Sequence, residues 1–192
     1  MPYFSVMQLI VYLRTNFGLS NEVLQQIDEA STTKVYPKKE IILQPGHYSK
    51  NVYFVQEGLV RMFYPKGGKH ITHYFFPEMT FAGATDSMFY DKQSIYGIEA
   101  VETSTVTRIP LSVIMKLAED TIAVNQLIQT ILVEALMGFS SRLQSLQFET
   151  AQERYQNLLT QHPGILLRAP LGDIASYLGI SQQTLSVIRA QR

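Results

Sequence analysis

The chain contains 192 residues, with 16 Lys or Arg, 16 Asp or Glu and no Cys. This length fits one domain with room for a small appendage, and 46% hydrophobic against 17% charged residues excludes a disordered chain. The lack of Cys excludes disulfide scaffolds, thiolate nucleophiles and Cys-based zinc sites. A net charge of zero gives no argument from the whole chain for a nucleic-acid partner.

The first 30 residues predict two short helices. Apolar residues recur at helical spacing between Val6 and Phe17, Gly18 ends this run, and Ser20 can cap a second helix. The N-terminus has no basic region followed by a cleavage site, so we expect no secretion signal. The most apolar stretch, residues 121–139, contains Glu134 and several amides, which argues against a membrane-spanning helix. We therefore expect a cytoplasmic protein without a membrane partner.

Residues 34–110 predict a set of short strands separated by turn signals. Several strands at such close spacing indicate a small roll, sandwich or barrel, and no helical pattern interrupts them to build a parallel α/β sheet. The expected fold class is therefore α+β, with an antiparallel β-roll. The predicted strands are Val35–Tyr36, Ile41–Leu43, Val52–Val55, Leu59–Tyr64, His70–Phe76, Ile95–Glu99 and Ser104–Ile109.

From Leu111 onwards the pattern is helical, and residues 121–148 predict one helix about 40 Å long. Its apolar residues form a seam with spacings of three and four, and this seam needs a cover. Two explanations are open: core packing under the roll, or a coiled-coil-like contact between two chains, and they can coexist on different faces. We expect a homodimer through residues 121–148. The seam comprises Val124, Leu127, Ile128, Ile131, Leu132, Ala135, Phe139, Leu143 and Leu146.

The residues after this helix carry a different charge from the rest. Residues 1–141 contain 11 basic and 13 acidic residues, whereas residues 142–192 contain five basic and three acidic ones, and the five are all Arg. This weakly favours an anionic partner at the C-terminus. A further helix is expected from Ala151 to Thr160, followed by a stop at His162-Pro163-Gly164 and a short extended piece, LLRAP.

The last 22 residues predict two helices joined by a tight turn. Leu171, Ile174, Ala175 and Leu178 give the first helix one apolar face. Gly179 allows the left-handed backbone of the turn, Ser181 can cap the second helix, and its apolar residues Leu185 and Ile188 face the first. This order is typical of a helix-turn-helix, and the alternative is a plain helical hairpin.

The second of these helices carries residue types that bind nucleic acid. Gln and Arg reach base edges with two hydrogen bonds, and a helix-turn-helix presents its second helix to the major groove. The candidate DNA-binding residues are Ser181, Gln182, Gln183, Thr184, Ser186, Arg189 and Arg192.

The motifs together resemble the Crp–Fnr superfamily of bacterial transcription regulators. The resemblance rests on QPG at 44–46, YFVQEGLVR at 53–61, the long helix and the stretch 153–189, which is similar to the family's C-terminal domain. It implies a cyclic-nucleotide-binding-like roll with N-terminal helices in residues 1–120, a dimerisation helix in 121–148 and a helix-turn-helix domain in 149–192, with a short or absent wing. It also implies that a small effector held between roll and helix reorients the DNA-binding heads.

The segment 81–100 departs from the members of this family that bind cyclic nucleotides. The family's ribose-binding Glu is replaced by Ala84, and its Arg-Ser pair by Ser94 and Ile95. Losing the charged partner of a buried phosphate costs several kcal/mol, so we expect no response to cyclic AMP but an unidentified, less polar effector. The candidate pocket residues are Phe81, Gly83, Ala84, Ser94, Ile95 and Tyr96.

The remaining sites are few. His70 and His73 lie three apart on a predicted strand and so point to opposite faces, which is poor spacing for a metal. We expect no metal, no cofactor and no enzymatic activity. Val187 stands where the family often has an Arg. The sequence therefore predicts a DNA-binding regulator, and the alternative is a small-ligand or protein-interaction sensor with a vestigial DNA-binding head.

Overall fold

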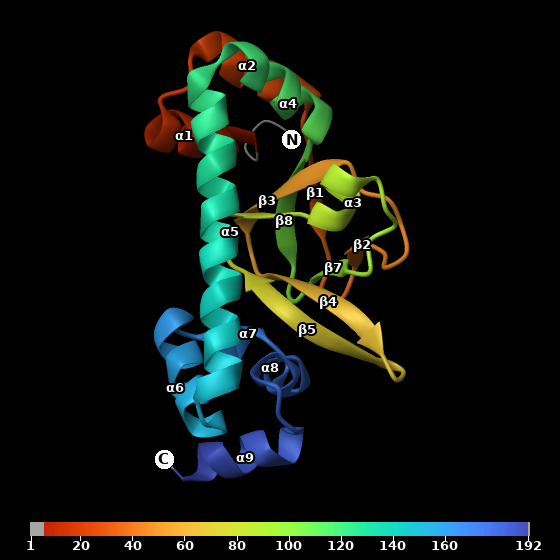
Figure 1. Ribbon diagram of the computed structural model, residues 1–192, viewed down its shortest axis with the longest axis vertical. Helices are drawn as coiled ribbons and strands as arrows, with labels where there is room; N and C mark the ends of the chain where they lie inside the picture. The colour runs from red at the N-terminus through yellow and green to blue at the C-terminus, as the bar shows by residue number, and fades with distance from the viewer. Residues whose placement is uncertain (1–5, 192) are drawn as a thin grey trace.

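The computed structural model describes residues 6–191, in which two antiparallel sheets lie beside one long helix (Figure 1). The strand order is β1-β8-β3-β6 in the first sheet and β2-β7-β4-β5 in the second. This arrangement confirms the predicted α+β class. The strands are β1 (Thr32–Tyr36), β2 (Ile41–Leu43), β3 (Asn51–Glu57), β4 (Val60–Lys66), β5 (Lys69–Phe76), β6 (Thr80–Ala82), β7 (Gly97–Ala100) and β8 (Ser104–Pro110).

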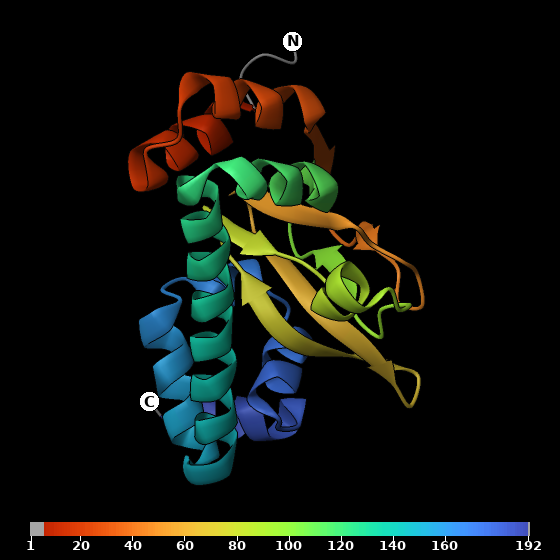
Figure 2. The same ribbon diagram turned by 45° about the horizontal axis from the view of Figure 1, so that its top comes forward.

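Helices cover the two ends of the roll. The first four are α1 (Val6–Phe17), α2 (Asn21–Ala30), α3 (Thr85–Tyr90) and α4 (Leu111–Asp120). The others are α5 (Ile122–Phe148), α6 (Ala151–Gln161), α7 (Ile165–Arg168), α8 (Leu171–Leu178) and α9 (Gln182–Ala190). Helix α5 runs the length of the molecule, from α1, α2 and α4 at one end to α6–α9 at the other (Figures 1 and 2).

Local signals fix several helix ends, and the sequence predicted those at Gly18 and Ser20. Gly18, with φ of 60°, ends α1, and the Ser20 hydroxyl accepts a hydrogen bond of 3.3 Å from the Val23 amide at the start of α2. Helix α6 begins with a reciprocal capping box between Thr150 and Glu153. These contacts satisfy amides that have no partner inside the helix.

Three short elements differ from the sequence prediction. Strand β6 and helix α3 lie in the segment after Pro77, where three and six residues are too few to show a hydrophobic period. The piece LLRAP was expected to be extended, but Ile165–Arg168 forms the single-turn helix α7. Ile165 is only 2% exposed there, so its burial in the C-terminal core outweighs the weak local preference of the segment.

The predicted seam of α5 divides between two faces. Val124 and Leu127 are buried and belong to a cluster that also contains residues of α1, α2 and α4. Leu132, Leu143 and Leu146 are each more than two-fifths exposed. The seam therefore covers the core at its N-terminal end and is uncovered towards its C-terminal end.

Two further cores hold the rest of the molecule. One lies between the sheets and includes Val55, Val60 and Ile98. The other joins α6–α9 to the roll, because Leu59 and Phe75 belong to the same buried cluster as Ile174 and Leu185. The C-terminal helices are thus packed against the second sheet, mainly through α8 and β5.

Candidate functional site

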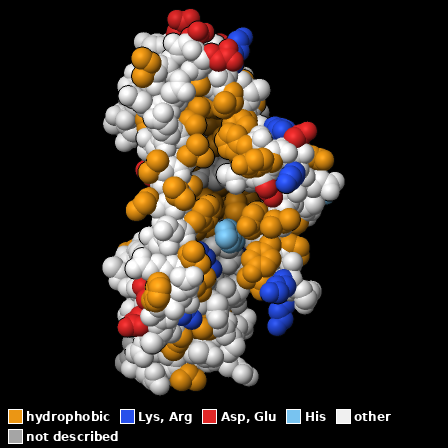
Figure 3. Space-filling view, in the orientation of Figure 1, with side chains coloured by type: hydrophobic (Ala, Val, Ile, Leu, Met, Phe, Trp, Pro, Cys, Tyr) orange, Lys and Arg blue, Asp and Glu red, His pale blue; other side chains and the backbone are white. Residues whose placement is uncertain are grey.

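A cavity of about 250 Å³ lies between α5 and the roll. In the space-filling view, hydrophobic side chains gather around the hollow beside α5 (Figure 3). No Lys, Arg, Asp or Glu is among the described residues that line it, and its few polar groups include His73, Thr85 and Tyr96. The α5 wall is formed by Leu127, Ile128, Ile131, Leu132, Ala135 and Phe139.

Three of the six predicted pocket residues line this cavity: Phe81, Gly83 and Tyr96. Gly83 leaves room for Met88, whose sulfur would lie 2.7 Å from a Cβ at that position. The aromatic character of the first and third residues makes the wall apolar. The sequence prediction thus found one part of the wall.

The other three predicted pocket residues lie elsewhere. Ala84 is fully buried, and its carbonyl accepts hydrogen bonds from the amides of Ser87 and Met88 in α3. Ser94 is also fully buried, and its hydroxyl accepts a hydrogen bond of 3.0 Å from the Tyr96 amide. Ile95 is 63% exposed, and its amide donates to Asp86 at 3.1 Å. These residues shape the loop around α3 without lining the cavity.

The acidic groups of the loop around α3 make local contacts. Asp86 accepts hydrogen bonds from the amides of Ser87 and Ile95 within the loop. Lys50 pairs with Asp91 at 2.8 Å, and both side chains are exposed. Residues 85–96 contain no Arg, and the exposed Lys92 lacks the forked geometry with which an Arg binds phosphate.

His73 and Thr85 are polar cavity residues that the sequence did not identify. The pairing of β4 with β5 shifts from Met62–Tyr74 to Phe63–Thr72, so His73 is the extra residue of a β-bulge. A bulge re-aims a side chain, and the ring lies 4.9 Å from Tyr96 and 5.3 Å from Phe139 between ring centroids. Burial, with a smaller contribution from Arg142, lowers the pKa of His73. The imidazole is therefore neutral near pH 7.

His70 points to the other face of β5, as its spacing from His73 predicts. Its ring stacks on Phe63 with centroids 4.2 Å apart. Among residues 6–191 no cluster of three or more His, Cys, Asp or Glu is arranged to hold a metal ion.

The second candidate site is formed by α8 and α9. Gly179 adopts φ of 69° between them, and the Ile180 amide donates to the Ala175 carbonyl at 3.0 Å. Ser181 caps α9 by accepting a 3.0 Å hydrogen bond from the Thr184 amide. Buried apolar residues pack the two helices together and onto α6 and α7, and the four helices α6–α9 form the C-terminal head. These residues are Ile174, Ala175, Leu178, Leu185 and Ile188. The predicted helix-turn-helix geometry is confirmed.

The outward face of α9 is set by its buried face. Because successive residues turn by about 100°, Gln183, Val187 and Ala190 lie opposite Leu185 and Ile188. These three residues are exposed, and Val187 is 57% exposed. This face lies at the end of the molecule, away from the roll (Figure 1).

The other candidate DNA-binding residues lie around this face. Ser181 and Thr184 serve the cap, and the Ser186 hydroxyl donates to the Gln182 carbonyl at 3.0 Å. The amide of Gln182 lies against Gly172 of α8. Arg189 is exposed at the side of the face, and Arg192 lies outside the described residues.

Three of the C-terminal arginines are used inside the molecule. Arg142 stacks on the Tyr177 ring at 3.9 Å and donates to the Tyr177 carbonyl at 2.6 Å. Arg154 donates to the carbonyls of Leu178 and Glu149, and Arg168 pairs with two glutamates of the roll. The excess of Arg after residue 141 therefore does not amount to a basic surface of the same size.

Residues 33–121 match the family model described as cyclic nucleotide-binding domain. No curated protein matches the chain. The match covers the two sheets together with α3 and α4, and it ends at the residue before α5.

Solved structures with the same fold include several regulators. FixK2 from Bradyrhizobium japonicum is 22% identical, with 84% of this chain and 83% of that chain covered and a TM-score of 0.73. A putative Crp/Fnr-family transcriptional regulator from Eubacterium rectale is 16% identical, with coverages of 93% and 85% and a TM-score of 0.72. The catabolite activator protein of Thermus thermophilus is 23% identical, with coverages of 94% and 85% and a TM-score of 0.56.

Proposed function

We propose that this chain is a member of the Crp–Fnr superfamily and a DNA-binding transcription regulator, and the match to the cyclic nucleotide-binding domain and the shared fold support this. The observation that carries the proposal is the capped helix-turn-helix, whose second helix faces away from the roll at the end of the molecule (Figure 1). Such a helix is free to enter a major groove. We propose a regulatory and not a catalytic role, in the cytoplasm.

Within the head, we propose different tasks for different residues. Gln183 and Ser186 read base edges, because both are exposed on α9: the Gln183 amide can donate and accept hydrogen bonds, and the Ser186 oxygen can still accept one. Arg189 contacts phosphate from the side of the helix, and Arg192 extends this contact. Ser181, Gln182 and Thr184 hold the N-terminus of α9 against α8 and place the reading residues.

We propose that two chains pair along α5. Of its uncovered apolar residues, Leu132, Leu136 and Leu143 recur at spacings of four and seven, and Val133 and Met137 at a spacing of four, so they lie along one side of the helix. By length and composition alone α5 could also cross a membrane, with a mean hydropathy of 1.5 over its most apolar window. However, Arg142 of α5 donates to the Tyr177 carbonyl of α8, and Val124 is fully buried in the cluster with α1, α2 and α4. Both contacts favour pairing of folded protomers. The uncovered stripe comprises Leu132, Val133, Leu136, Met137 and Leu143.

We also propose that the cavity takes a small, neutral, mainly apolar effector and not cyclic AMP. The wall offers neutral His73 and Tyr96 as hydrogen-bonding groups, and burial raises the pKa of Tyr96 so that its phenol stays protonated. A charged phosphate would lose its hydration without gaining an ionic partner, which costs several kcal/mol. In this proposal residues 1–120 bind the effector, 121–148 dimerise and 149–192 bind DNA.

A second function is favoured by the use of Arg142, Arg154 and Arg168 inside the molecule. A sensor that passes its signal to a protein partner, with a vestigial head, needs no basic surface. The two functions differ in whether the head binds DNA.

The test is binding of the wild-type chain to pooled genomic DNA fragments, measured by fluorescence anisotropy at two salt concentrations. Arg189→Ala should weaken binding and reduce the salt slope by about one unit, because one phosphate contact is lost. Arg108→Ala, which removes an exposed arginine from β8 of the roll, is the matched control and should behave like wild type. Absence of wild-type binding would contradict the proposal and favour the sensor.

A further inference from the structure

Arg61 of the roll is buried against the DNA-binding head. The residue is only 4% exposed. Its neighbours in β4, Val60 and Met62, belong to the core between the sheets. Its guanidinium donates to Glu99 at 3.1 Å and to Thr72 at 2.9 Å within the roll. A buried charge of this kind needs ionic partners, because desolvation costs several kcal/mol.

The shortest contact of Arg61 is made with the head. Its Nη1 donates to Oδ1 of Asp173, in the first turn of α8, at 2.6 Å. The side chain of Asp173 is only 20% exposed. Moving α8 away from the roll would therefore leave Arg61 with one carboxylate in place of two, and would leave Asp173 without its basic partner.

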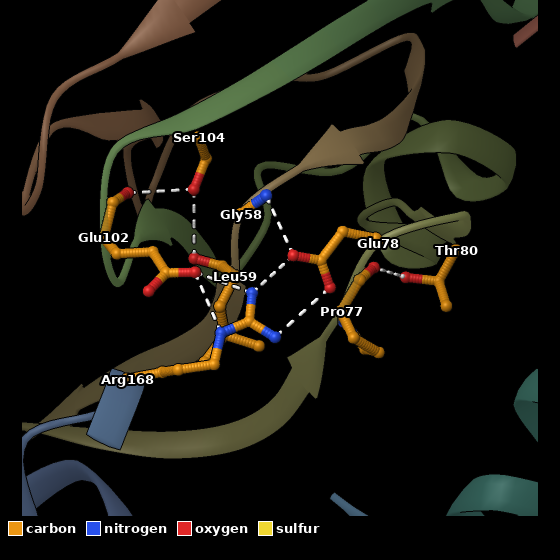
Figure 4. Close-up of polar contacts among 8 residues, drawn as sticks. All are labelled: Gly58, Leu59, Pro77, Glu78, Thr80, Glu102, Ser104 and Arg168. Carbon is orange, nitrogen blue, oxygen red and sulfur yellow. Dashed lines mark hydrogen bonds and ion pairs between the residues drawn. The ribbon is translucent and has the colours of Figure 1, made fainter. Parts of the chain in front are cut away.

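Three more polar contacts join the head to the roll. The amide of Thr72 in β5 donates to the Ser176 hydroxyl of α8 at 3.1 Å. Arg168 pairs with Glu78 and with Glu102, each at 2.6 Å, and thus connects the end of α7 to two turns of the roll (Figure 4). With the shared apolar cluster around Phe75, these contacts fix the direction of α8 as well as its distance.

The strands that hold the head also line the cavity. Arg61 faces the head, whereas the next residue of β4, Met62, lines the cavity. In β5, Thr72 faces the head and the bulged His73 lines the cavity. Because adjacent residues of a strand point to opposite faces, one pair of strands contacts both sites.

We infer that Arg61 and Asp173 are positioning residues for DNA recognition, which hold the helix-turn-helix in a fixed orientation on the sheet that lines the cavity of the same protomer. The inference rests on the proposed function of the head. The docked head leaves Gln183 and Val187 of α9 exposed, so the contact orients the reading face without covering it. Loosening this contact should weaken the recognition of sequence.

The test compares Asp173→Asn with wild type by two methods. Hydrogen–deuterium exchange should become faster in residues 60–66 and 171–178, since these segments contain Arg61 and Asp173, which lose their ion pair. Affinity for a duplex that the wild-type chain selects from a random-sequence pool should fall about tenfold, or about 1.4 kcal/mol, with an unchanged salt slope. A fall in affinity is informative, because removing a negative charge from the protein would by itself strengthen its binding to DNA.

Three variants complete the design. Asp173→Glu keeps a carboxylate within reach of Arg61 and should restore part of the affinity. Glu119→Gln removes an exposed acidic group from α4, at the far end of the molecule, and should resemble wild type (Figure 1). If Asp173→Asn does not fold, Ser176→Ala should show smaller changes in the same directions.

The outcomes separate the positioning role from the proposed function. An Asp173→Asn chain that exchanges like wild type, or that binds the selected duplex as tightly as wild type, overturns the positioning role alone. A wild-type chain that selects no sequence contradicts DNA recognition itself, and the exchange measurement then still tests whether Asp173 holds the head.

Discussion

The cavity and the C-terminal helix-turn-helix are built from the chain in opposite ways. The cavity collects residues from α1, both sheets, α3, α4 and α5, between Leu13 and Phe139. The helix-turn-helix uses 20 consecutive residues, 171–190, whose cap, turn and apolar contacts are neighbours in sequence. A site of the first kind can change its ligand class through a few distant substitutions, whereas the second keeps its geometry as long as its local pattern is intact.

The two regions also differ in how they use charge. The cavity has no ionised side chain among its described lining residues, while the outside of the same sheet holds Arg61, Glu99 and Asp173 together. The head takes up Arg142, Arg154 and Arg168 in structural contacts and leaves Arg189 exposed. DNA affinity in this chain should therefore depend on few phosphate contacts and more on the orientation of the head.

The largest effect is expected where α5 connects the two regions. Leu136→Asp places a charge in the uncovered stripe, where Leu136 is 67% exposed in the single chain. Burying this charge between two chains costs several kcal/mol, so light scattering should change from twice the mass of one chain to the monomer mass. Leu167→Asp is the control, because Leu167 is 92% exposed in α7 and outside the stripe. A monomeric wild-type chain would contradict the pairing.

A smaller effect is expected for base recognition. Gln183→Ala should lose discrimination of about 1–3 kcal/mol at a single base pair, because the amide group makes two hydrogen bonds to one base. Binding to duplexes that carry single substitutions in a selected site measures this loss. Gln191→Ala, just beyond α9, provides the control. Equal losses at every position would instead indicate a contact to phosphate.

A still smaller effect concerns His73 in the cavity. Its lowered pKa means that, as pH falls below about 6.5, the unfolded chain takes up protons that the folded chain resists, so the free energy of unfolding decreases. His73→Phe should reduce this decrease, which urea denaturation at about pH 7.5 and about pH 5.5 measures. The same substitution at exposed His47 is the control, and an unchanged pH dependence in His73→Phe would show that its burial is not maintained in solution.

The smallest effect is expected from cyclic AMP. A ligand present at a hundred times its dissociation constant adds about 2.7 kcal/mol of stability, which would be evident in a thermal melt. At about 1 mM cyclic AMP we expect almost no change in the melting temperature, since no Lys or Arg is among the described residues that line the cavity. A rise of several degrees would show that another group binds the phosphate.

The sequence predicted the elements that depend on neighbours in the chain. The ends of α1, α2 and α6, most strands and the helix-turn-helix follow from caps, turn glycines and periodicity. Helix α7 was not predicted, because its formation depends on the burial of Ile165 in the C-terminal core. The periodicity of α5 also could not show which apolar residues face the roll and which are uncovered.

Contacts between distant residues could not be predicted from one sequence. Arg61 and Asp173 are 112 positions apart, and Arg168 and Glu78 are 90 apart. An Arg between Val60 and Met62 was the one local sign of a buried charge. His73 was assigned to the correct face of its strand relative to His70, but the bulge that aims it into the cavity depends on the pairing of β4 with β5.

The most direct test of the account is selection of DNA by the wild-type chain from a random-sequence pool at physiological salt. A paired α5 with two exposed α9 helices should select a two-fold-related site whose half-sites are about one helical turn, roughly 34 Å, apart. Enrichment of a single half-site would contradict the symmetric dimer. Failure to enrich any sequence would contradict DNA recognition by the head.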